Sequence, residues 1–213
     1  MASQTDLAYG YIKKKILDGS YRPSQKLTEN ELATIIGVSR NTVKNALLKL
    51  QQEQLVVIEP NKGASIRVFT LDEVLNYLEI REVVEGLVVR AVAKDISDSQ
   101  IQGLKEIIEA MPVLLETHKL EEYSCLNKNF HDIIYKSARN VQAVELITMI
   151  KTQLIRYQFR TILVPGRSQE SLKEHRKIYE ALQAHDEVEA EKAIRDHVSN
   201  VRRIIEQNYQ LLL

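Results

Sequence analysis

Three of the five histidines in this sequence have the spacing of side chains that could hold a metal ion. His131, His175 and His197 fall within three different helical patterns, each with apolar residues three or four positions away. One histidine directed into a helical core is more often a hydrogen-bonded core residue than a ligand. Three neutral imidazoles that converge from separate helices, however, commonly hold zinc, nickel or a similar divalent ion. The spacing therefore leaves two interpretations open, a polar core and a metal site.

A second set of polar residues follows Ser39, which is placed to cap a helix. Residues 43–50 carry apolar side chains at spacings of three, four and seven, which predicts an amphipathic helix. The side chains left free at its N-terminal end are cationic, amide or hydroxyl groups, namely Arg40, Asn41, Thr42, Lys44 and Asn45. Such groups on the first turns of a helix can read base edges in the major groove of DNA.

The elements around Ser39 form a helix-turn-helix pattern followed by a hairpin. A short amphipathic helix is predicted over 6–17, and a capping box of Thr28 and Glu31 opens a second helix that ends at Gly37. Two β-prone runs, 55–58 and 64–68, flank a turn over 60–63. This hairpin is the expected wing, and Lys62 at its tip supplies a further phosphate-binding cation.

The rest of the chain is predicted to be entirely helical. The six predicted helices run over 70–94, 97–112, 119–139, 141–163, 169–184 and 187–211, with breaks at Pro112, Asn140, Pro165-Gly166 and His185-Asp186. Arg156 and Arg160 share one predicted helix face and could reach a cavity in the bundle. The fold class is therefore mainly α: a winged helix-turn-helix domain over 1–69 and a six-helix bundle over 70–213.

Composition and charge agree with a cytoplasmic DNA-binding protein. The sequence shows no apolar stretch long enough to span a membrane and no signal peptide, and its single cysteine excludes an internal disulfide. Of 29 basic and 29 acidic residues, ten and six fall in residues 1–69, a net charge of +4, which leaves −4 for residues 70–213. Phosphate contacts require local rather than overall positive charge.

Residues 7–68, and most clearly the segment from Leu27 to Ile66, resemble the DNA-binding region of GntR-family transcription regulators. In that family the recognition helix typically reads S-R-T-P-V-R-E-A-L, whereas residues 39–47 here read S-R-N-T-V-K-N-A-L. Arg40 is retained, Lys44 replaces a second arginine, and Asn30 stands where another arginine often lies near the bases. Lysine lacks the planar fork that pairs bidentately with guanine, so the usual operator sequence of the family cannot be assumed here.

Residues 71–210 resemble the FCD effector domain of the FadR branch, and the predicted helix count is nearer to its VanR-type subgroup. The resemblance implies a divalent metal bound by three histidines and an aspartate four residues before the first. Asn127 occupies the aspartate position, and a neutral amide oxygen is a weaker donor than a carboxylate. Arg81, in the family's E-x-R segment, is implied to face the effector; the alternative is a salt bridge with a glutamate such as Glu85.

The expected function is regulation of transcription by a homodimer that binds an inverted-repeat operator in double-stranded DNA. A small effector, expected to be an organic carboxylate, would alter operator binding through the helical domain. Two alternatives remain: a DNA-binding dimer whose helical domain senses nothing, and a metal-dependent hydrolase or lyase using the three histidines. No general base has a fixed role in the sequence, so no enzymatic activity is expected.

Overall fold

The computed structural model describes residues 3–60, 62–155, 157 and 161–212, and the chain divides into two compact units. The first unit ends at Thr70, and the second runs from Leu71 to Leu212. Each unit has a separate cluster of buried apolar side chains. None of the described helices is long and apolar enough to cross a membrane.

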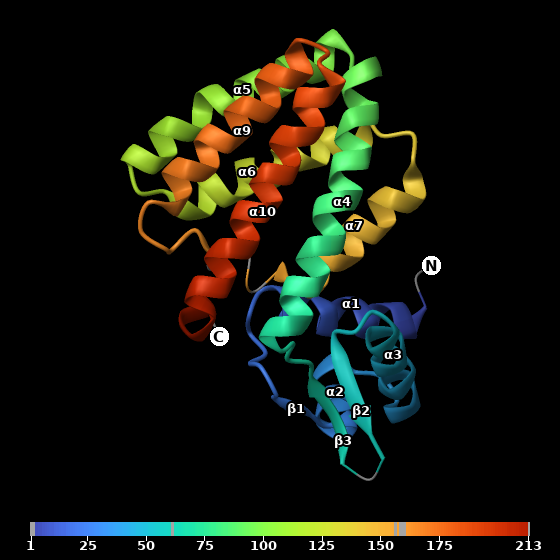
Figure 1. The fold of residues 1–213 in the computed structure, drawn as a ribbon. Coiled ribbons are helices and arrows are strands. Elements are labelled where there is room, and N and C mark those ends of the chain that lie inside the picture. The colour runs from blue at the N-terminus through green and yellow to red at the C-terminus, as the bar shows by residue number, and fades with distance from the viewer. Residues whose placement is uncertain (1–2, 61, 156, 158–160, 213) are drawn as a thin grey trace. The chain divides into compact units, whose positions relative to one another are not determined.

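The first unit consists of three helices and a small antiparallel sheet (Figure 1). Its elements are α1 (Gln4–Leu17), β1 (Lys26–Leu27), α2 (Glu29–Ile36), α3 (Arg40–Gln52), β2 (Val56–Glu59) and β3 (Gly63–Ile66). The central strand β3 pairs with β1 and with β2, in the order β1-β3-β2. Fully buried Ile12, Leu47 and Leu50 join α1 and α3 in the core beneath the sheet.

The winged helix-turn-helix predicted from the sequence is present, with two local differences. Thr28 is the N-cap of α2, but its side chain makes no capping hydrogen bond, so the predicted capping box is wrong. Instead, Glu29 and Glu31 place negative charge in the first turn of α2, where the helix dipole favours it. Strand β1 was not expected, because a strand of two residues is too short to show an alternating pattern.

The second unit is a bundle of helices (Figure 1). The described helices are α4 (Leu71–Asp95), α5 (Asp98–Glu116), α6 (Leu120–Lys136), α7 (Val141–Gln153), α9 (Arg167–Gln183) and α10 (Glu187–Leu212). Helices α4 and α10 pack along each other, and α5 packs against α6 and α9. Large apolar side chains such as Tyr123, Phe130 and Ile147 are fully buried at the centre of this bundle.

Two predicted helix boundaries in the bundle are wrong. Helix α5 continues through Pro112 to Glu116, although proline removes one hydrogen bond of the helix, because Met111 is buried and Leu115 packs on the same core. The helix predicted over 141–163 ends at Gln153, and Leu154 forms its C-cap. Residues 155, 157 and 161 are helical again, but Arg156 and Arg160 lie outside the described residues, as does Asn61 in the wing.

Candidate nucleic-acid interface and buried histidine site

The predicted DNA-reading residues lie on the exposed face of α3 and its N-terminal turn. Ser39 caps the helix, because its Oγ accepts a hydrogen bond from the Thr42 amide at 3.1 Å. The opposite face of α3 is buried through Val43, Ala46, Leu47 and Leu50, which fixes the helix on the core of the unit. The side chains of Arg40, Asn41, Lys44 and Asn45 are exposed, and that of Thr42 is partly buried.

Arg40 is held at the edge of this face by a glutamate that sequence analysis did not single out. Its Nε donates to Glu29 Oε2 on α2 at 2.7 Å, while the side chain stays 70% exposed. The two terminal nitrogens make no hydrogen bond with the described residues. They are the atoms that pair with O6 and N7 of guanine, so Glu29 orients Arg40 without occupying its base-reading edge.

The two remaining predicted DNA contacts come from other elements of the first unit. Asn30 is exposed on α2, and its backbone carbonyl accepts a hydrogen bond from Thr34. Lys62 lies in the wing with a 74% exposed side chain, and its Nζ contacts Glu59 Oε2 at 2.6 Å. An ion pair this exposed is weak in water. It leaves Lys62 able to exchange Glu59 for a phosphate.

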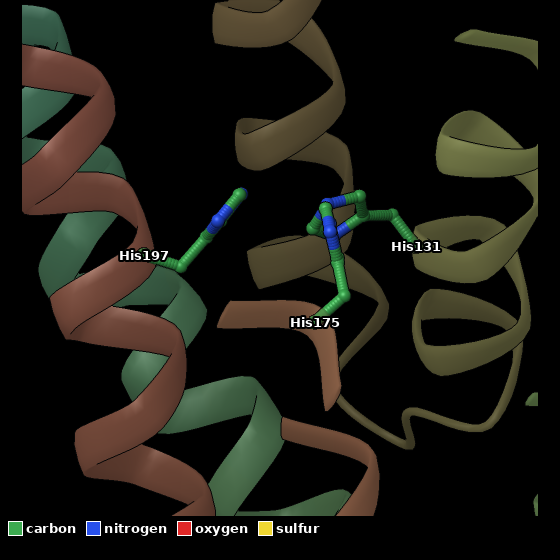
Figure 2. A group of neighbouring side chains, drawn as sticks. All are labelled: His131, His175 and His197. Carbon is green, nitrogen blue, oxygen red and sulfur yellow. The ribbon is translucent and has the colours of Figure 1, made fainter. Parts of the chain in front are cut away.

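The three histidines converge inside the helical unit, as Figure 2 shows. His131 comes from α6, His175 from α9 and His197 from α10, and one nitrogen of each lies within 4.8 Å of the others. The Nε2 atoms of His131 and His175 are 3.1 Å apart. Two imidazoles on one tetrahedral ion, with metal–nitrogen bonds of about 2.0 Å, have nitrogens about 3.3 Å apart, so this geometry suits a shared metal.

The histidines are held neutral by their surroundings. All three are buried, and burial lowers the pKa of each below its usual range. Nearby positive charge acts in the same direction, since Lys151 lowers the pKa of His131 and His197 lowers that of His175. Neutral imidazole is the form that binds metals.

Glu174 on α9 orients the third imidazole and was not named as a site residue from the sequence. Its Oε2 accepts a hydrogen bond from His197 Nδ1 at 2.7 Å, and it is further bound by Arg167 and by Asn200. Burial alone would raise the pKa of Glu174, but the bonds from His197 and Arg167 lower it below its usual value. The only sequence signal was its position beside His175.

Asn127 lies one helical turn before His131 on α6, as its spacing predicted. Its Oδ1 is buried and makes no hydrogen bond with the described residues. A buried amide oxygen without a partner is costly, and a cation bound beside it would remove that cost. Three neutral imidazoles and this oxygen therefore fit a divalent transition metal.

Arg81 is buried in a salt bridge with Glu85, one turn further along α4. Its side chain is 3% exposed and that of Glu85 is fully buried. This is the alternative that the sequence left open beside effector binding. Although burial alone would raise the pKa of Glu85, the Arg81 charge lowers it, so both groups are ionised.

The first unit defines a winged helix-turn-helix DNA-binding protein, to which a helical unit with a buried polar site is joined. The sequence matches the profile of bacterial regulatory proteins of the gntR family over residues 4–66 and that of the FCD domain over residues 76–200. The chain belongs to the GntR family and carries an FCD domain. It is a DNA-binding transcription regulator.

Related proteins and solved structures agree with this assignment. The HTH-type transcriptional repressor RspR of Escherichia coli (strain K12) is 26% identical over 199 residues, 93% of this chain and 87% of that protein. The Uxu operon regulator of Haemophilus influenzae is 27% identical over 214 residues, 90% of this chain and 77% of that protein. The structure of E. coli McbR/YncC superposes with a TM-score of 0.79 at 19% identity, covering 98% of this chain and 100% of that chain.

Proposed function

We propose that this regulator acts in the cytoplasm as a homodimer that binds an inverted-repeat operator, and that a small carboxylate effector controls this binding. The assignment of DNA reading to residues 1–69, and of effector binding and dimerisation to residues 70–213, is part of the proposal. The observation that carries the effector role is the convergence of His131, His175 and His197, with Asn127, whose buried oxygen has no hydrogen-bond partner among the described residues, one helical turn before His131.

The proposed DNA-reading residues lie on α3 and its N-cap, on α2 and in the wing. They are Ser39, Arg40, Asn41, Thr42, Lys44, Asn45, Asn30 and Lys62. Arg40 is the candidate for a specific guanine contact, because its fork is oriented by Glu29 and its terminal nitrogens remain accessible. Lys62 is placed to bind phosphate and so to contribute affinity rather than specificity.

In the helical unit, His131, His175 and His197 would bind a divalent transition metal such as zinc or nickel, with Asn127 Oδ1 as a weaker fourth ligand. When bound, the metal supplies an electropositive coordination position for an effector carboxylate. The contact of His197 Nδ1 with Glu174 favours the tautomer that leaves the lone pair on Nε2, and Ser171 contacts His175 Nδ1 at 3.3 Å.

The dimer is supported by an apolar stripe on α4. Ile80, Val83 and Leu87 have relative exposures of 47%, 54% and 55%, and their spacing places them along one side of the helix. The buried side of α4, which includes Val88, Val89 and Val92, already packs in the bundle core. A second copy of α4 would remove the exposed apolar surface from water.

The effector would change the fraction of dimers whose two N-terminal units are positioned to bind one operator. Residues 67–70 are the whole connection between β3 and α4.

A binding selection from random duplex DNA tests the proposal, because the selection itself identifies the operator sequence. The selected sequence should be an inverted repeat, and fluorescence anisotropy with this duplex should report two chains per site. Zinc or nickel together with a small carboxylate should change the affinity. Selection of an asymmetric site bound by a monomer would contradict the dimer, and unchanged affinity with every metal and carboxylate would contradict effector control.

A further inference from the structure

Three ionisable side chains lie close together beside the histidine site, and their charges do not balance. Arg81 and Glu85 of α4 form a buried salt bridge through Nε and Oε1. The third is Lys151 of α7. The charge of Arg81 lowers the pKa of Lys151, and the charge of Glu85 raises it. The group thus contains two cations and one buried carboxylate. Asp132 on α6 also raises the pKa of Lys151. However, Asp132 is partly exposed and forms no ion pair with Lys151.

Lys151 is linked to the histidine site through the aromatic ring of Tyr135. Its Nζ is 3.4 Å from the hydroxyl of Tyr135 and 4.8 Å from the centroid of that ring. The Tyr135 ring in turn stacks on the His131 imidazole, with centroids 5.9 Å apart and an interplanar angle of 25°. Lys151 forms no ion pair with any described residue, so its positive charge has no anionic partner in direct contact.

We infer that Lys151, and not Arg81, is the cation that receives the carboxylate of the effector. This inference rests on the proposed function, in which a small carboxylate binds beside the histidines. The charge of Arg81 is already neutralised by Glu85. An effector that displaced Glu85 from Arg81 would leave the fully buried Glu85 carboxylate ionised without a partner. Lys151 gives up only a weak contact with Tyr135 when it turns to an anion.

A groove in the surface leads to the same ring. It has a volume of about 590 Å³ and lies between α6 and α7, where Asp132, Tyr135, Val144 and Thr148 line it. Thr148 is one turn before Lys151 on α7, so both side chains lie on the same side of that helix. Tyr135 therefore lines the groove, is contacted by Lys151 and stacks on His131, which makes it the link between the groove, the lysine and the histidine site.

The test uses the full-length, zinc-loaded protein and four probes: acetate, lactate, succinate and citrate. Thermal denaturation with increasing probe concentration gives the apparent affinity of each acid. For every acid that stabilises the wild type, Lys151→Met should weaken binding by roughly tenfold or more. Lys151→Arg should retain most of the binding, because it keeps the charge. Lys105→Met is the matched control, since Lys105 is an exposed lysine on α5, and it should bind like the wild type.

Zinc titration and operator binding of Lys151→Met separate this inference from the proposed function. If zinc affinity falls with carboxylate affinity, Lys151 acts through the metal site and the inference is overturned. Carboxylate binding by Lys151→Met within about twofold of the wild type overturns it as well. If none of the four acids stabilises the wild type, the inference fails although operator binding persists. Loss of operator binding by the wild type itself would instead contradict the proposed function.

Discussion

Glu174 and His197 lie on neighbouring helices, α9 and α10, and are joined by a hydrogen bond of 2.7 Å from Nδ1 to Oε2. This bond places the proton of neutral His197 on Nδ1 and leaves the Nε2 lone pair free for a metal. Glu174 is itself fixed by two hydrogen bonds from the buried guanidinium of Arg167. The orientation of one proposed ligand is therefore set by residues that do not touch the metal.

Replacing Glu174 by glutamine should weaken metal binding while the three histidines remain. The amide keeps the shape and one acceptor oxygen but loses the charge that makes His197 a stronger donor. Loss of such an outer partner typically costs about 10- to 100-fold in metal affinity. Zinc titration against a competing chelator measures this effect. Glu180→Gln, at an exposed position on the same helix, is the control and should bind zinc normally.

The stability of the chelator-treated protein should fall on the acid side of neutrality. Burial lowers the pKa of His131, His175 and His197 in the folded chain, whereas the unfolded chain takes up protons near pH 6.5. Below about pH 6.5 the unfolded state binds more protons, and the free energy of unfolding should drop by up to roughly 1.4 kcal/mol per pH unit for each histidine. Urea denaturation at about pH 8, 6.5 and 5.5 measures it. A flat profile would mean that the histidines are accessible to protons.

Arg40→Ala should weaken operator binding by roughly 1–3 kcal/mol and relax the base preference at one position of each half-site. The fold should persist, because the side chain is exposed and its ion pair with Glu29 is at the surface. Anisotropy titrations at one salt concentration measure the affinity, and circular dichroism measures the helix content. Lys62→Ala should cost less and reduce the salt dependence. Wild-type affinity in Arg40→Ala would show that α3 does not read DNA through this residue.

Most of the fold could be predicted from the sequence, because its signals are local. Helix caps such as Ser39, the left-handed turn at Gly37 and the apolar spacing on α3 each depend on a few neighbouring residues. The end of α5 was missed because tertiary packing decides it. Pro112 does not end α5, because packing on the core outweighs the missing hydrogen bond.

The candidate site was only partly predictable, for a similar reason. The histidine trio was found because each member lies on an apolar helix face, which directs it inward. Lys151 and Glu174 resemble surface residues in the sequence, and only the packing of α6, α7 and α9 places them beside the histidines. Likewise, the sequence offered two roles for Arg81, and the structure adds the observation that Glu85 already neutralises it.

Leu87→Glu should dissociate the proposed dimer. A carboxylate in the middle of the exposed stripe on α4 would have to be desolvated on association, while the folded monomer would be unaffected because Leu87 is 55% exposed. Sedimentation or light scattering at micromolar concentration measures the mass. Val113→Glu, at a similarly exposed position on α5, is the matched control and should remain dimeric. A dimer that survives Leu87→Glu would place the interface elsewhere.

The buried side-chain oxygen of Asn127 has no hydrogen-bond partner among the described residues. In Asn127→Asp an anionic oxygen replaces a neutral one at the same reach, so zinc or nickel affinity should rise by about tenfold or more, roughly 1.4 kcal/mol. His175→Ala removes one imidazole and should lower the affinity instead. Elemental analysis and metal titration of the wild type and both variants, first chelated and then reloaded, distinguish these effects. If wild type and Asn127→Asp both stay metal-free while His175→Ala remains folded and effector-responsive, the three histidines are polar core residues and the metal hypothesis is wrong.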